Sequence, residues 1–153
     1  MLIYMIIAVL LLAAFVNAVR AVIIMRRVKG EAISEYDYRR ANDMVDSDIS
    51  RDDFLAAYKR SHGARGPVYA AVTLFTAAVL TPPMLALISI SYEYLWRWNG
   101  QERAFEPGYL VWQFILFGCV IAGWALIGHI GARLYYRNLP GSLEAELAGL
   151  KRA

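Results

Sequence analysis

The chain of 153 residues is 59% hydrophobic and 19% charged, and its formal net charge at pH 7 is +3. Its apolar residues gather in three long blocks, which favours a single-domain, all-α membrane protein over a soluble globular protein. The basic residues lie at the ends of these blocks, so we expect no nucleic-acid partner. The single cysteine, Cys119, excludes an internal disulfide framework and a metal site made of thiols alone.

The first apolar block predicts a membrane helix over residues 2–25, because about 20 apolar residues suffice to cross a bilayer. A cleaved signal peptide is the alternative interpretation, since Val16-Asn17-Ala18 resembles a cleavage site. A signal peptide carries its positive charges ahead of the apolar core, whereas here they follow it from Arg20 onwards. We therefore expect an uncleaved anchor whose N-terminus is exported.

The next segment, residues 26–66, is polar and carries basic and acidic side chains in nearly equal number. It predicts two short amphipathic helices. The first covers about residues 31–44, where a loose apolar stripe recurs at helical spacing. The second follows Ser50 as its N-cap, with Asp52 and Asp53 in the first turn, where the helix dipole favours acids. We expect both helices to lie on the membrane surface or on a partner.

The second apolar block predicts a membrane helix over residues 67–96, which ends in tyrosines and tryptophans typical of the headgroup region. Pro82 and Pro83 lie in its middle and remove two backbone donors, so the carbonyls near Ala78 and Val79 lose their partners. We expect a kink at this point. It is either a static packing feature, or a hinge or pocket for a lipid tail or quinone.

A short loop over residues 97–107 precedes a third predicted membrane helix over residues 108–132. Small residues recur along this helix at spacings of three or four and so share one face: Gly118, Ala122, Ala125, Gly128 and Gly131 or Ala132. Small residues let two helices approach closely in lipid. We therefore expect this row, with Pro82 and Pro83, to form a packing interface, either within this chain or with another protein.

The tail, residues 133–153, predicts a short amphipathic helix that is capped by Ser142 and has leucines at 143, 147 and 150. Lysine and arginine are far more numerous in the 26–66 segment and the tail than in the 97–107 loop. By the positive-inside rule, the segment and the tail face the cytoplasm. We expect a bacterial inner membrane protein with a periplasmic N-terminus and a cytoplasmic C-terminus.

Chemistry-bearing residues are few. His129, near the cytoplasmic end of the third predicted helix, is a weak candidate for contact with a quinone or haem, and nothing in the sequence places His62 opposite it. Residues 46–50 resemble the start of a calcium loop, but Arg51 and Ala57 occupy the positions that require glycine and glutamate. We find neither a catalytic motif nor zinc-ligand spacing, so we expect no enzyme, no metal and no cofactor beyond bound lipids.

These features predict a non-catalytic accessory subunit of a larger inner-membrane complex, with other integral membrane proteins and lipids as its partners. A respiratory or photosynthetic electron-transfer chain is suggested only by analogy with other small multi-span subunits. The first alternative is a membrane-anchored assembly or regulatory factor that binds a partner through the charged 26–66 segment. The second alternative is a small quinone- or haem-site protein that uses His129.

Overall fold

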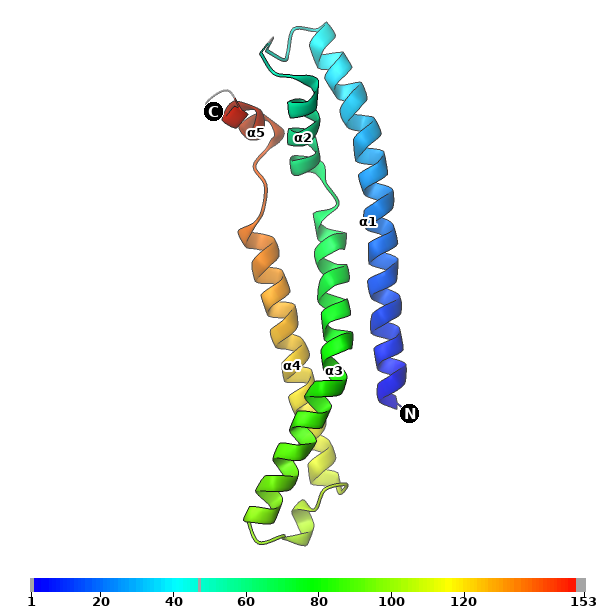
Figure 1. Ribbon diagram of the computed structural model, residues 1–153, viewed down its shortest axis with the longest axis vertical. Coiled ribbons are helices and arrows are strands. Elements are labelled where there is room, and N and C mark those ends of the chain that lie inside the picture. Colours follow the sequence, from blue (N-terminus) through cyan, green and yellow to red (C-terminus); the bar gives the residue numbers. More distant parts are fainter. Residues whose placement is uncertain (1, 47, 151–153) are drawn as a thin grey trace. The chain divides into compact units, whose positions relative to one another are not determined.

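The computed structural model describes residues 2–46 and 48–150, and within these ranges every regular element is a helix (Figure 1). The three long helices are each long and apolar enough to cross a membrane, which confirms the predicted all-α class with three candidate spans. In chain order the elements are α1 (Leu2–Ala41), α2 (Arg51–His62), α3 (Arg65–Trp98), the short 3₁₀ helix η1 (Arg103–Phe105), α4 (Leu110–Arg137) and α5 (Leu143–Leu150).

The chain divides into two compact units, and each of the three long helices contributes to both. Unit 1 comprises Met1–Phe15 and Ala70–Arg133, and unit 2 comprises Val16–Tyr69 and Leu134–Ala153. Unit 1 therefore holds most of α3 and α4 with the connection between them. Unit 2 holds the charged segment, α2 and α5.

Helix α1 is longer than the predicted first span, because it does not break where its apolar block ends. Its 40 residues measure about 60 Å, roughly twice the hydrocarbon thickness of a bilayer. The separate helix predicted over residues 31–44 is therefore wrong, since the chain up to Ala41 continues α1. No proline interrupts this run, and the single glycine in it, Gly30, costs only about 1 kcal/mol in a helix.

A Schellman motif ends α1. The N–H of Met44 donates to the carbonyl of Arg39 over 2.8 Å, and the N–H of Asp43 donates to the carbonyl of Arg40 over 3.4 Å. Asp43 takes the left-handed conformation, with φ of 54°, at the position where glycine is usual. The absence of that glycine explains why the sequence did not indicate where α1 ends.

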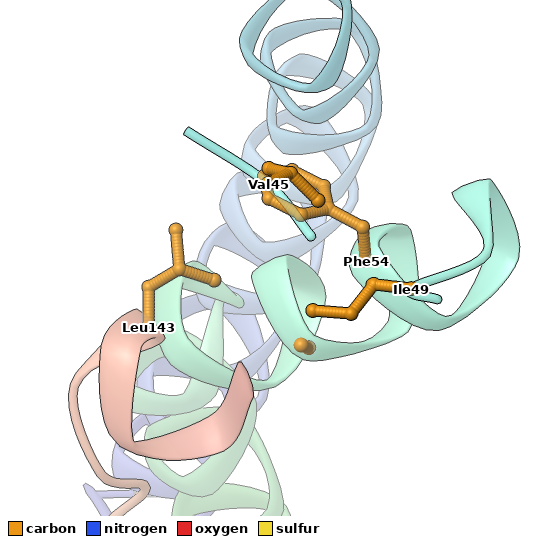
Figure 2. Packing of buried hydrophobic residues seen from close by; sticks show 5 residues of the cluster. Val45, Ile49, Phe54 and Leu143 are labelled. Carbon is orange, nitrogen blue, oxygen red and sulfur yellow. The ribbon is translucent and has the colours of Figure 1, made fainter. Parts of the chain in front are cut away.

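Unit 2 has a small hydrophobic core that brings together the connection after α1, α2 and α5. Figure 2 shows Val45, Ile49, Phe54 and Leu143 side by side, and Phe54 is fully buried. The ring of Tyr36 on α1 lies 5.3 Å from that of Phe54, which adds α1 to the same cluster. The charged segment is thus part of a folded unit that includes α5.

Both short helices of unit 2 begin where the sequence predicted. The side chain of Ser50 accepts a hydrogen bond from the N–H of Asp53 over 3.1 Å, which confirms it as the N-cap of α2. The N–H of Ala145 donates to the hydroxyl of Ser142 over 3.2 Å at the start of α5. The leucines of the predicted stripe pack on the core of this unit, whereas an amphipathic helix of this kind is expected on the membrane surface or on a partner: Leu143, Leu147 and Leu150.

Helix α3 remains a single helix across Pro82 and Pro83, and Figure 1 shows that it bends in its middle. It begins at Arg65, two residues before Pro67, whose missing N–H is harmless in a first turn. At its other end Gly100 has a φ of 83°, and the N–H of Gln101 donates to the carbonyl of Trp96 over 3.2 Å. This glycine-centred cap ends the helix before η1.

Candidate functional site

A hydrogen bond between α3 and α4 lies next to the two prolines. The indole Nε1 of Trp124 donates to the hydroxyl of Thr81 over 2.9 Å, and that hydroxyl donates to the carbonyl of Ala77 over 2.6 Å. Thr81 is fully buried. The carbonyls that lose their partners to Pro82 and Pro83 are those one and two residues after Ala77, so this bond joins the two helices beside the bend without replacing the missing donors.

Two glycines of α4 face α3. A Cβ on Gly131 would collide with the hydroxyl of Thr73 and would lie 3.2 Å from the Cβ of Thr73. A Cβ on Gly123 would collide with the sulfur of Met84. As residue numbers rise along α3 they fall along α4 at these contacts, so the two helices pack antiparallel.

Apart from Gly131, the predicted row of small residues lies on the other side of α4. Gly118, Ala122, Ala125 and Ala132 are exposed, Gly128 is partly exposed, and a Cβ on either glycine of the row would meet nothing within 4 Å. With 3.6 residues per turn, the row points away from the face that carries Gly123 and Gly131. Within the described residues α3 therefore packs on Gly131, the alternative last member of the row, and the use of the rest of the row as an interface stays a prediction.

The two histidines belong to different units. His129 in unit 1 is exposed on α4 and falls on the same side of the helix as the small residues. His62 in unit 2 stacks on Tyr58, with ring centroids 4.3 Å apart. The structure therefore places each imidazole within its own unit, and the haem or quinone role of His129 stays a prediction.

Unit 2 contains a polar hollow of about 470 Å³ where the polar part of α1, the end of α2 and the start of α5 meet. Arg39 donates to Glu35 over 2.6 Å at its wall. Burial raises the pKa of Tyr58, the carboxylates of Glu31 and Glu35 raise it further, and Arg39 opposes them. The lining side chains are mostly polar: Glu35, Arg39, Tyr58, Ser61, His62, Gly141, Ser142, Leu143 and Glu144.

Ser61 and His62 form the pair in this hollow that most resembles a nucleophile and its base. The hydroxyl of Ser61 lies 2.8 Å from Nδ1 of His62, and it also lies 3.2 Å from the carbonyl of Ala57 and 3.1 Å from that of Tyr58. A serine at the end of a helix commonly bonds to these backbone carbonyls. We interpret the pair as part of the end of α2, because no described side chain orients the far nitrogen of His62, as a catalytic base requires.

The described parts of the chain, residues 2–46 and 48–150, contain no cluster of three His, Cys, Asp or Glu side chains that could hold a metal ion. The fold is that of an all-α protein with three helices that are long and apolar enough to cross a membrane and with a second unit that contains the charged segment. Comparison with protein-family models, curated proteins and solved structures gives no match. The function must therefore be inferred from the residues of this chain.

Proposed function

We propose that the protein is a non-catalytic accessory subunit of a larger membrane protein complex, and that α4 docks on an integral membrane partner. One observation carries this proposal. Helix α4 has small residues on two faces. Among the described residues, α3 covers the face with Gly123 and Gly131, while Gly118, Ala122, Ala125 and Ala132 are exposed and Gly128 is partly exposed.

Exposed glycines are unfavourable in a membrane helix unless something packs against them. A glycine costs about 1 kcal/mol relative to alanine in a helix, and large apolar side chains are better suited to lipid. In the described chain a Cβ added to Gly118 or Gly128 would meet nothing within 4 Å, so no close contact there requires a glycine. A partner helix that approaches this row closely would offset the cost of the glycines through van der Waals contact.

His129 supports the same face. Its imidazole is exposed on α4 one turn before Arg133, where a polar side chain facing hydrocarbon is costly. A partner helix packed on the small residues would also offer His129 an acceptor or donor. The row and the histidine therefore favour one and the same docking surface.

The second candidate is an assembly or regulatory factor that binds through the 26–66 segment. The polar hollow of unit 2 favours it, because that segment supplies Glu35, Arg39 and His62 to a folded, accessible surface. The two candidates differ in stoichiometry, since a subunit co-purifies at a fixed ratio and a transient factor does not.

Mild-detergent purification on a C-terminal tag, followed by native mass spectrometry, tests the proposal. We expect a large assembly at fixed ratio. Ala122→Leu with Ala125→Leu fills the row, and we expect about tenfold less co-purified partner, the result of roughly 1.4 kcal/mol of misfit. Cys119→Leu is the matched control, because Cys119 is exposed beside the row. A lone species, or equal loss with both variants, contradicts the proposal.

The optical spectrum of the same preparation tests the electron-transfer assignment and the cofactor alternative. A haem spectrum in the assembly supports an electron-transfer complex. If His129→Ala removes that spectrum, or a quinone-dependent activity, while the partner ratio is unchanged, the cofactor alternative replaces docking as the role of His129.

A further inference from the structure

A second hollow in unit 2 differs in character from the polar one. It has a volume of about 440 Å³, within the usual range for small-molecule sites. It lies between α1 near Met25, the end of α2 and the beginning of α3. Its lining is Met25, Val28, Lys29, Lys59, Gly63, Ala64, Arg65, Val68 and Tyr69.

The lining combines an apolar wall with a cluster of positive charge. Lys29, Lys59 and Arg65 come from three different helices, and no lining residue is acidic. None of the three pairs with a carboxylate among the described residues, whose ion pairs all involve other basic groups. The hollow therefore has three uncompensated cations beside apolar side chains.

The position of the hollow along the chain matches a membrane surface. Met25 and Val28 stand where the apolar block of α1 gives way to charge, and Val68 and Tyr69 stand where that of α3 begins. Basic and tyrosine side chains are typical of this boundary, at the depth of the lipid headgroups. The apolar wall then lies at the depth of the first acyl carbons.

Contacts inside unit 2 fix two of the lining residues. Arg65 donates to the backbone carbonyl of Asn138, and the side-chain amide of Asn138 donates to the hydroxyl of Tyr69 over 3.1 Å. The ring of Tyr69 meets that of Tyr135 edge-on at 5.7 Å. These contacts tie the start of α3 to the end of α4 and hold one side of the hollow in place.

The turn between α2 and α3 also depends on a glycine. A Cβ on Gly63 would lie 2.5 Å from the carbonyl oxygen of Lys59, so a larger residue would force the turn to open. This turn sets the distance between Lys59 and Arg65.

We propose that this hollow binds an anionic phospholipid of the surrounding bilayer, with its phosphate between Lys29, Lys59 and Arg65 and its acyl chains along the exposed side chains of Met25 and Val68. The inference does not depend on the docking of α4. Basic pockets between membrane helices suit anionic headgroups. A quinone headgroup is uncharged and would leave the three cations without a counter-charge, and an acidic peptide would not need the apolar wall.

Lipid retention by the full chain tests this proposal. The protein is purified in mild detergent, supplied with a mixture of phosphatidylglycerol and phosphatidylcholine, and analysed by native mass spectrometry for bound lipid. We expect selective retention of phosphatidylglycerol. Lys29→Gln, Lys59→Gln and Arg65→Gln together should lower it at least tenfold, because each basic group near an anionic surface contributes roughly a fivefold change.

A charge-matched control separates a built site from general attraction to a basic surface. Arg20→Gln, Arg26→Gln and Arg27→Gln remove the same charge from α1 without touching the hollow, and we expect less than a twofold change. Equal losses in the two triple variants, or none in either, would overturn the proposal.

A steric variant leaves the cations in place. Val68→Trp fills the apolar wall at a side chain that is 39% exposed, so the fold has room to accept it. We expect reduced phosphatidylglycerol retention with an unchanged helical circular dichroism spectrum. Unchanged phosphatidylglycerol retention by this variant would overturn the proposal. If a soluble glutamate-rich peptide also displaces the lipid equally well from the variant and from the unaltered protein, the hollow is a purely electrostatic surface for acidic partners.

Discussion

The indole nitrogen of Trp124 donates to the hydroxyl of Thr81 over 2.9 Å, so a polar bond joins α3 and α4 immediately before Pro82. The hydroxyl in turn donates to its own helix at Ala77. Thr81 therefore satisfies two groups in an apolar setting where water is scarce. The bond holds the bent part of α3 against α4.

Removal of either partner of this bond should weaken the α3–α4 contact. Thr81→Val leaves the indole N–H without an acceptor, and we expect a loss of about 1–3 kcal/mol in the free energy of unfolding. Trp124→Phe removes the donor, with a loss of about 0.6–1.5 kcal/mol from the bond itself. Unfolding in detergent by increasing dodecyl sulfate measures both values.

Thr81→Ser is the matched control, because it keeps the hydroxyl and should retain most of the stability. A double-mutant cycle completes the test. If the effects of Thr81→Val and Trp124→Phe simply add, the hydrogen bond contributes nothing, and the prediction is wrong.

Substitution by alanine should change stability in opposite directions at Gly131, which faces α3, and at Gly128, which faces away from it. Gly131→Ala places a Cβ against Thr73, and we expect about 1–3 kcal/mol of destabilisation from overpacking. Gly128→Ala meets open space within the chain and should be neutral or stabilising by up to about 1 kcal/mol, because alanine is the better helix former. The same unfolding assay on the isolated chain compares the two, and equal effects would contradict the assigned faces.

The sequence predicted the local features that depend on a few neighbouring residues. Ser50 and Ser142 have the side chains that cap helices, and both cap them. The three apolar blocks follow from composition, since a bilayer requires uninterrupted apolar length. The leucine stripe of α5 follows from helical spacing alone, but spacing does not show that Leu143 is buried against the same chain.

Features that depend on a distant partner were not predicted. Helical spacing groups most small residues of α4 on one face, but spacing cannot tell which face α3 covers, and α3 packs on the face of Gly123 and Gly131. Val45 and Leu143 belong to one hydrophobic cluster although they lie almost a hundred residues apart, and no local pattern indicates this. Tertiary packing decides both features.

The left-handed Asp43 offers a test of how α1 ends. Glycine adopts φ of 54° without steric cost, so Asp43→Gly should raise the free energy of unfolding by roughly 0.5–1 kcal/mol. Asp43→Val should lower it by more than that amount, because a β-branched residue is strained in this conformation. Thermal unfolding followed by circular dichroism measures the change. A destabilised Asp43→Gly variant would show that the aspartate makes a contact worth more than the strain.

The raised pKa of Tyr58 predicts that the free energy of unfolding falls in alkaline solution. Burial and the nearby carboxylates of Glu31 and Glu35 raise its pKa in the folded protein above the usual value of 10.0. The unfolded chain therefore ionises first, and the stabilising contribution, complete below pH 10, is lost as pH rises through the folded pKa. Tyrosinate ultraviolet absorbance in a pH titration reports the ionisation.

Tyr58→Phe should remove this part of the pH dependence, and Glu31→Gln should move it to lower pH. A titration of the folded protein that is unchanged by Tyr58→Phe would contradict the assignment.

The predicted orientation can be tested with single cysteines in a Cys119→Ser background. The charge distribution predicts that Glu102, between α3 and α4, faces outward and that Ala56, exposed on α2, faces the cytoplasm. Glu102→Cys should react with a membrane-impermeant thiol reagent added to intact cells. Ala56→Cys should react only after the cells are opened. Since three spans put these two positions on opposite sides, the reverse pattern would invert the orientation, and labelling of both in intact cells would contradict the three-span topology.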